Sequence, residues 1–250
     1  MITRIALREL RNLFLSPLAW TLLAVIQFIL AWLFFAQMDS FFSLQAQLAV
    51  IENAPGATDL IVAPLFNTAS SLMLMITPLL SSRLISEERR NGSLQLLLSS
   101  PVSMTEIVLG KYLGLVLFLV ILVAMITLMP LSLLMGTSLD MGKLLSGMMG
   151  LILLLTAFAA AGLYISSTTK NPTVAAVASF GLLIMFWIID VAGSAVEQGG
   201  TVFSYLSIIK HNIPMLRGIV NSSDLIYYLL FICTFIILSI RQLDAIRLQK

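Results

Sequence analysis

The stretch IVLGKYLGLVLFLVILVAMITLMPLSLLM, which runs from Ile107 to Met135, decides the fold class, and Lys111 is its only charged residue. A helix needs about 20 mostly apolar residues to cross the hydrocarbon core of a bilayer, and this stretch exceeds that length. In lipid, an open strand would leave backbone N–H and C=O groups unpaired. The segment is therefore predicted to be a transmembrane helix that tilts, or that bends at Pro130.

The whole chain is strongly apolar, as this stretch is. Of its 250 residues, 59% are hydrophobic and 10% are charged, and the mean hydropathy is +1.03. Soluble domains carry about 25% charged residues. We predict an all-α polytopic membrane protein, a single transmembrane domain over residues 1–250 with about six spans. The predicted spans are 18–36, 60–80, 107–135, 144–165, 173–191 and 224–240.

Charge and composition exclude several classes of function. The net charge of +2 is too small and too scattered for a nucleic-acid partner. A single cysteine, Cys233, and a single histidine, His211, leave no disulfide framework and no two-histidine metal site. His211 is expected in a loop. The first span is not a signal peptide, because residues 18–36 exceed a typical signal core and no small-x-small cleavage site follows.

The basic residues divide unevenly between the two sides of this topology. Of the 14 basic residues, three fall on one side: Lys143, Lys210 and Arg217. Six acidic residues cluster there or at its membrane edge, and they are Asp39, Glu52, Asp59, Asp140, Glu197 and Asp224. The other basic residues fall on the side that holds the termini, and they are Arg4, Arg8, Arg11, Arg83, Arg89, Arg90, Lys111, Lys170, Arg241, Arg247 and Lys250. Because an excess of basic residues marks cytoplasmic loops, both termini are predicted to be cytoplasmic.

The connection between the second and third spans, residues 83–103, is predicted to form an elbow of two short helices. Arg89 and Arg90 suit the C-terminus of a helix, and Asn91-Gly92 supplies a left-handed cap. Ser93 can then cap a new turn, which Ser100-Pro101 stops. The leucines of that turn would be exposed unless membrane or protein covered them, although an ordinary loop lying on the headgroups is the simpler alternative.

These residues carry a family resemblance. The run Glu87-Glu-Arg-Arg-Asn-Gly-Ser-Leu-Gln-Leu-Leu-Leu-Ser-Ser-Pro-Val-Ser103, continued by Glu106-Ile-Val-Leu-Gly-Lys-Tyr-Leu-Gly114, resembles the signature of permeases of type 2 ABC exporters. The six-span layout agrees with that family over nearly the whole chain. Within it, a weaker match in the C-terminal tail resembles the gliding-motility permeases. Ser93 stands where the family often has threonine, which leaves the predicted cap intact.

The resemblance implies a division of labour between subunits. The elbow would be a coupling helix that docks on a separate ABC ATPase subunit, which would hold the ATP and Mg²⁺, while this chain binds no cofactor and is not an enzyme. A second permease copy or a paralogue would complete the pathway, in the lipid of a bacterial cytoplasmic (inner) membrane. The residues assigned to this interface are Glu87, Glu88, Arg89, Arg90, Gly92, Ser93, Leu94, Leu97 and Pro101.

Two glycines and one acidic residue of the predicted spans have two interpretations each. Gly110 and Gly114 form a small-residue face that favours close helix packing, with a dedicated dimerisation motif as the alternative. Asp190 is predicted either at the outer membrane interface or in a transport pathway. The segment Gly136–Lys143 lacks the spacing of a phosphate-binding loop, so this chain has no nucleotide site of its own.

Alternative functions are also open at this stage. The chain could be a self-sufficient secondary transporter or channel, although inverted repeats and interrupted helices are not evident. A non-transporting membrane assembly factor is the third class. Intramembrane proteolysis is disfavoured for two reasons. The di-glutamate pattern of Glu87-Glu88 wants an arginine four residues later, where Gly92 stands, and metal-dependent hydrolysis lacks a second histidine.

Overall fold

The computed structural model describes residues 1–48, 55–94, 102–137, 139–194 and 205–248, and these residues form an all-helical bundle. Six helical segments among them are long and apolar enough to cross a membrane, which confirms the predicted fold class and number of candidate spans. Their main helices are α2 (Pro17–Leu48), α3 (Ala63–Ser81), α6 (Met104–Leu131), α7 (Met141–Thr168), α8 (Pro172–Ser194) and α11 (Ser222–Leu248).

The observed helices differ from the predicted spans mainly at their ends. Helix α2 continues to Leu48, so the residues after 36 extend the first span. A π-helical turn, η1 (Thr58–Val62), leads into α3. Helix α6 ends at Leu131, one residue after Pro130, and the chain tightens into a 3₁₀ helix, η2 (Ser132–Met135).

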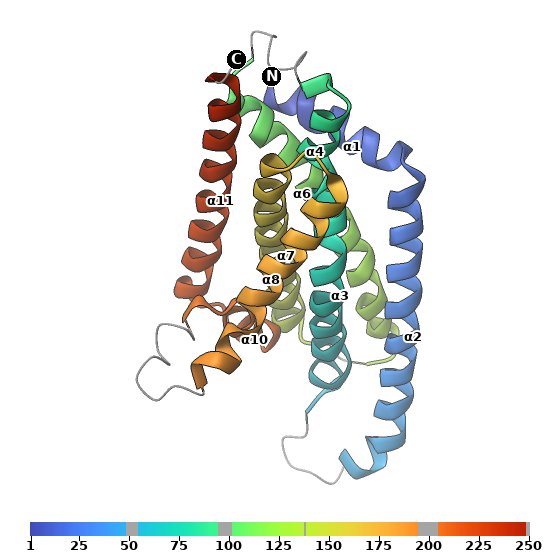
Figure 1. Cartoon of the computed structure of the whole chain (residues 1–250). Coiled ribbons are helices and arrows are strands. Elements are labelled where there is room, and N and C mark those ends of the chain that lie inside the picture. Colours follow the sequence, from blue (N-terminus) through green and yellow to red (C-terminus); the bar gives the residue numbers. More distant parts are fainter. Residues whose placement is uncertain (49–54, 95–101, 138, 195–204, 249–250) are drawn as a thin grey trace.

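Shorter helices lie at the two ends of the bundle. Figure 1 shows α1 (Ile2–Leu15) and α4 (Arg83–Arg90) at the end that holds both termini, and α10 (Ile208–Leu216) at the opposite end. An even number of spans brings both termini to one end. The chain turns between α1 and α2 at Ser16, which has an extended backbone and precedes Pro17.

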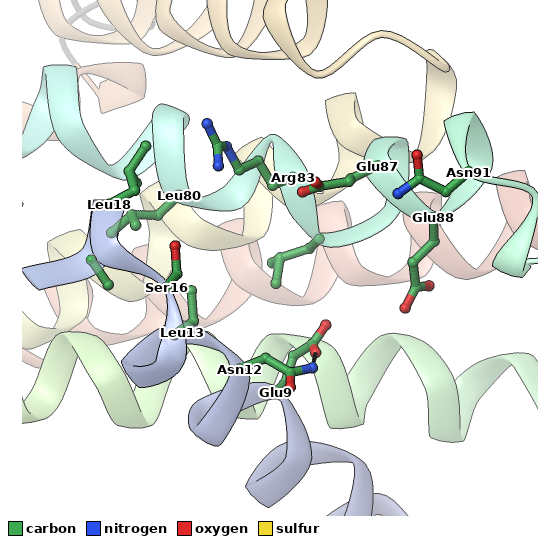
Figure 2. Close-up of a pocket in the computed structure, with 12 residues that line it drawn as sticks. Glu9, Asn12, Leu13, Ser16, Leu18, Leu80, Arg83, Glu87, Glu88 and Asn91 are labelled. Atoms are coloured by element: carbon green, nitrogen blue, oxygen red, sulfur yellow. Dashed lines mark hydrogen bonds between the residues drawn. The ribbon is translucent and has the colours of Figure 1, made fainter.

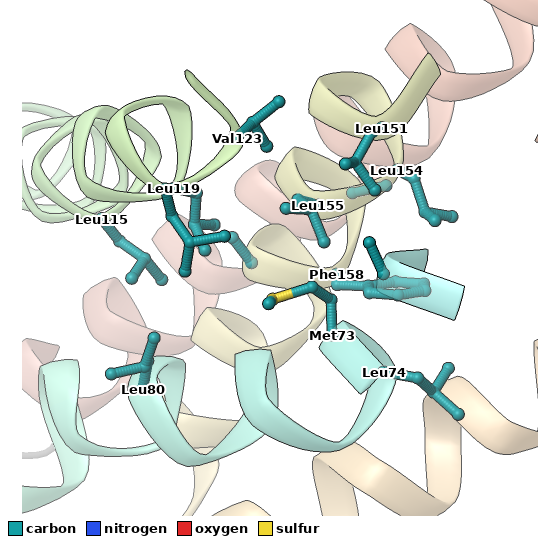
Figure 3. Packing of buried hydrophobic residues seen from close by; sticks show 14 of the residues in the cluster. Met73, Leu74, Leu80, Leu115, Leu119, Val123, Leu151, Leu154, Leu155 and Phe158 are labelled. Atoms are coloured by element: carbon teal, nitrogen blue, oxygen red, sulfur yellow. The ribbon is translucent and has the colours of Figure 1, made fainter. Parts of the chain in front are cut away.

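Helix α7 lies at the centre of the bundle, where it contacts α3, α4, α6, α8, α10 and α11. Its run of small residues, Ala159-Ala160-Ala161-Gly162, lets neighbouring helices approach closely. A Cβ atom on Gly162 would lie 2.7 Å from Cβ of Ser81, so α3 and α7 cross where only glycine fits. Figure 3 shows the adjoining core, in which leucines of α6 and α7 pack against Met73 and Phe158.

The outer faces of the helices are also apolar. On α2, Phe28, Trp32 and Phe35 are more than half exposed, at 73%, 71% and 61%. Contiguous exposed apolar surface of this kind is rare on a soluble monomer and is ordinary on a helix that contacts lipid. The bundle therefore has the surface of a membrane protein as well as its span lengths.

Candidate functional site

Helix α4 begins at a break in the helix that continues from α3, and a serine from α7 fills the break. Ser166 Oγ donates to the carbonyl oxygen of Ser82 at 2.7 Å and accepts from the backbone N–H groups of Ile85 and Ser86 at 3.1 and 3.0 Å. The first N–H groups of a helix have no partner within it. A side chain that inserts between two turns also bends a helix. Ser166 thus caps α4 from a neighbouring helix and fixes its direction.

A second contact with α7 holds the other end of α4. The guanidinium of Arg89 donates through Nη1 to the carbonyl oxygen of Ser167. Together, Ser166 and Ser167 place the C-terminal end of α7 against both turns of α4. The sequence-predicted interface residue Arg89 therefore contacts this chain itself.

The opposite side of α4 is held by a buried ion cluster. Lys111 of α6 has a side chain that is 0% exposed, and its Nζ lies 2.6 Å from Glu9 Oε1 of α1 and 2.8 Å from Glu88 Oε1 of α4. Arg8 Nη2 lies 3.9 Å from the same Glu88 oxygen. The cluster thus contains two cations and two anions. Buried charges are tolerated only when they are paired in this way.

Two glycines of α6 make this cluster possible. A Cβ atom on Gly110 would lie 2.6 Å from Ile5 Cβ, and one on Gly114 would lie 2.7 Å from Glu9 Cβ and 2.9 Å from the Ala6 carbonyl oxygen. Real Cβ atoms do not approach other atoms so closely, so α1 can lie this near α6 only over glycine. In the structure, Gly110 and Gly114 therefore pack against α1, and Glu9 reaches Lys111 across that contact.

A cavity of about 310 Å³ separates α1 from α4 beside the ion cluster. Figure 2 shows the carboxylates of Glu9 and Glu88 pointing toward one another from the two helices, with Arg83 and Glu87 farther along the α4 wall. Leu13 and Leu80 belong to its apolar lining. Because this space is not packed with side chains, α1 and α4 are joined there mainly through their shared cation, Lys111.

The C-terminal end of α4 is exposed. Gly92 has φ +74°, the left-handed conformation expected after Asn91, and Arg90, Asn91, Gly92 and Ser93 are all exposed. Leu94, in contrast, is 3% exposed. Its side chain belongs to the bundle core in this conformation, and its predicted role at a partner interface stays a prediction. Leu97 and Pro101 lie outside the described residues.

Helix α6 starts with a feature that the sequence interpretation missed. Ser103 caps the helix by accepting from the Glu106 N–H at 3.2 Å, and the Glu106 carboxylate accepts from the Ser103 N–H at 3.1 Å. The spacing Ser-x-x-Glu is the sequence signal for such a capping box. The cap fixes where α6 begins and hence where the connection from α4 must arrive.

At the opposite end of the bundle, the structure corrects the predicted position of His211. His211, predicted in a loop, lies in α10 and is 6% exposed, because residues 208–216 form a short helix packed against α7 and α11. Asp190 lies near the C-terminal end of α8, and its role in a pathway stays a prediction. Within the described ranges, no group of His, Cys, Asp and Glu side chains is arranged to hold a metal ion.

These features define a class: a polytopic helical membrane protein whose terminal helix α1 and short helix α4 are joined by buried ions. The comparison with protein families then identifies the family. A profile described as "ABC-2 family transporter protein" matches residues 3–240, so the chain belongs to the membrane components of ABC-2 type transporters. This family lacks ATPase domains, and its members in general work with a separate ATPase. A comparison with curated proteins found no match.

Proposed function

We propose that this chain is the permease subunit of an ATP-driven exporter in a bacterial cytoplasmic membrane, with both termini in the cytoplasm. It would form a homodimer, or a heterodimer with a paralogue, and the transport pathway would lie between the two permeases. ATP and Mg²⁺ would be bound by a separate ABC ATPase subunit. The resemblance to gliding-motility permeases belongs to this proposal as well.

The observation that carries the proposal is the attachment of α4 on both sides. Ser166 and Ser167 of α7 hold one side, and Lys111 of α6 holds the other through Glu88. A short helix that is attached to two spans by polar contacts can transmit a movement of its docking partner to both spans. A loop that merely lay on the headgroups would need no such contacts.

The docking surface that we propose is narrower than the whole elbow. Arg90, Asn91, Gly92 and Ser93 are exposed in the structure, whereas Glu88 and Arg89 are engaged within the chain. In the proposal, the exposed residues meet the ATPase, and Glu88 and Arg89 pass its movement to α6 and α7. A charged residue at the rim of such an interface contributes to its register and association rate.

Co-purification tests this proposal. The full chain and a candidate ABC ATPase from the same genome would be co-expressed and purified in mild detergent through a tag on the chain. We expect the ATPase to co-purify with the parent chain, to be lost with Arg90→Glu and to be retained with Arg241→Glu, which reverses another exposed charge. If no ATPase co-purifies, or if both variants retain it equally, the proposed docking surface is wrong.

A further inference from the structure

At the end of the bundle opposite the termini, His211 has a hydrogen-bond acceptor at each of its two ring nitrogens. Nδ1 lies 2.6 Å from Asp224 Oδ1, and Nε2 lies 2.9 Å from the backbone carbonyl oxygen of Tyr205. Both side chains are buried, with His211 6% and Asp224 5% exposed. The ring also stacks on Tyr227, with a centroid distance of 4.0 Å and an interplanar angle of 20°.

This geometry sets the number of protons at the site. A neutral imidazole has one N–H donor and one acceptor nitrogen. The carbonyl oxygen of Tyr205 can only accept, so Nε2 must carry a proton. The contact between Nδ1 and Asp224 then needs a second proton, which lies on either Nδ1 or the carboxyl group. In both assignments, the His211–Asp224 pair holds one proton more than a neutral histidine beside a carboxylate.

We propose that His211 and Asp224 form a proton-binding site that fastens the start of α10 to α11. When the extra proton leaves, the imidazole can satisfy only one of its two contacts. If Nδ1 keeps the remaining proton, the Nε2 lone pair faces the Tyr205 carbonyl; if Nε2 keeps it, the Nδ1 lone pair faces a carboxylate. A buried polar group that loses its partner in this way is unfavourable.

The neighbouring contacts determine which segment responds. Tyr227 Oη and Tyr228 Oη donate to the carbonyl oxygens of Leu206 and Ile208, at 2.7 and 3.2 Å, and fasten the same segment to α11. Each tyrosine hydroxyl donates its own proton, whereas the His211–Asp224 contact depends on the extra proton. Only the His211–Asp224 contact is therefore expected to respond to moderate changes in pH.

The second half of α10 is held by groups that do not titrate. Ser146 of α7 donates to the Met215 carbonyl oxygen at 2.8 Å, and Asn212 donates to Ser70 of α3 at 3.3 Å. Loss of the proton thus weakens the attachment of the first half of the segment, which keeps its two tyrosine contacts, while the second half stays attached. Lys210, the other charged residue of α10, has a contact of its own.

One substitution at this pair keeps its hydrogen bonds and removes the need for the extra proton. In Asp224→Asn, the amide NH₂ group can donate to Nδ1 of a neutral His211, while Nε2–H still donates to Tyr205. The amide oxygen can accept from Asn221, which donates to Asp224 Oδ2 at 3.1 Å in the parent chain. Asp224→Asn therefore satisfies every contact without the extra proton. His211→Gln removes the imidazole ring and cannot span both acceptors.

Hydrogen–deuterium exchange of the full chain in lipid nanodiscs tests the proposal. Exchange in residues 205–211 would be measured at about pH 6 and about pH 9 and corrected for the intrinsic pH dependence of exchange. We expect the corrected exchange of the parent chain to rise about tenfold at the higher pH, since a hydrogen bond to a charged group is lost. Asp224→Asn should stay protected at both values, and His211→Gln should exchange rapidly at both.

Asp190→Asn is the matched control, because it removes a carboxylate from a different helix, α8. It should keep the parent response. Exchange in α7, measured in the same samples, reports whether each variant is folded. A parent chain with the same corrected exchange at both pH values overturns the proposal, and so does a response that persists in Asp224→Asn or disappears in Asp190→Asn.

Discussion

Lys111 Nζ lies 2.6 Å from Glu9 Oε1, although 102 positions separate the two residues in the chain. The contact joins α1 to α6 in the interior, where an unpaired charge is strongly unfavourable. Glu88 shares the same ammonium group, so one lysine holds α1, α4 and α6 together. The N-terminal helix and the short helix α4 therefore cannot separate from α6 without exposing or neutralising a charge.

Lys111→Met is expected to destabilise the folded chain by about 3–5 kcal/mol, because it leaves the buried Glu9 carboxylate without a cation and Glu88 with only Arg8, at 3.9 Å. The triple variant Glu9→Gln, Lys111→Met, Glu88→Gln removes the charges of these three residues, leaves the half-exposed Arg8, and should recover most of this loss. Thermal unfolding in detergent, followed by tryptophan fluorescence, measures both. Equal losses in the single and triple variants would show that packing, rather than charge pairing, gives the cluster its stability.

Ser166→Ala should destabilise the junction of α3 and α4 by about 1–3 kcal/mol, since the Ile85 and Ser86 N–H groups lose their acceptor in a buried site. Ser167→Ala is the matched control. Its hydroxyl donates only to Tyr164 in the same helix, so a change within about 0.5 kcal/mol is expected. Unfolding midpoints of the two variants, compared in one detergent, check the difference, and similar losses would contradict a capping role for Ser166.

The sequence predicted the elements of this fold far better than their contacts. A long apolar run such as 107–135 shows a span because lipid imposes both its length and its helical form. The left-handed conformation of Gly92 was also predictable, because few other residues adopt it readily. Both features depend on local chemistry alone.

The contacts of the candidate site depend on residues far apart in the chain. A serine at 166 looks like any small residue of a span, and nothing local shows that it caps a helix more than 80 positions away. Lys111 was expected among the cytoplasmic charges, and its burial depends on Glu9, Glu88 and the glycines that bring α1 close. His211 was misplaced because a short helix such as α10 has no span-length signal to reveal it.

Gly114→Ala should displace α1 from α6 and cost about 1–3 kcal/mol, as overpacking of a close contact does. The added Cβ would lie 2.9 Å from the backbone oxygen of Ala6, which cannot move without its helix. Gly181→Ala is the control, because a Cβ at that exposed position of α8 has no neighbour within 4 Å. The control should be neutral or slightly stabilising, since alanine favours helix over glycine. Protease accessibility of the N-terminal helix, measured with unfolding midpoints, distinguishes local release of α1 from general instability.

Leu94→Ala is expected to weaken the fold itself, and Ser93→Ala is not, although the two residues are adjacent at the end of α4. Leu94 is 3% exposed and packs in the bundle core, and truncation of a buried leucine costs about 2–5 kcal/mol. Ser93 is exposed, and its hydroxyl makes a long contact of 3.4 Å with the Glu88 carbonyl oxygen, so a change within about 0.5 kcal/mol is expected. Both variants would be compared by thermal unfolding and by co-purification with the ATPase. If Leu94→Ala leaves the unfolding midpoint unchanged but abolishes co-purification, Leu94 is a docking residue after all, and the exposed surface at Arg90–Ser93 is not the whole interface.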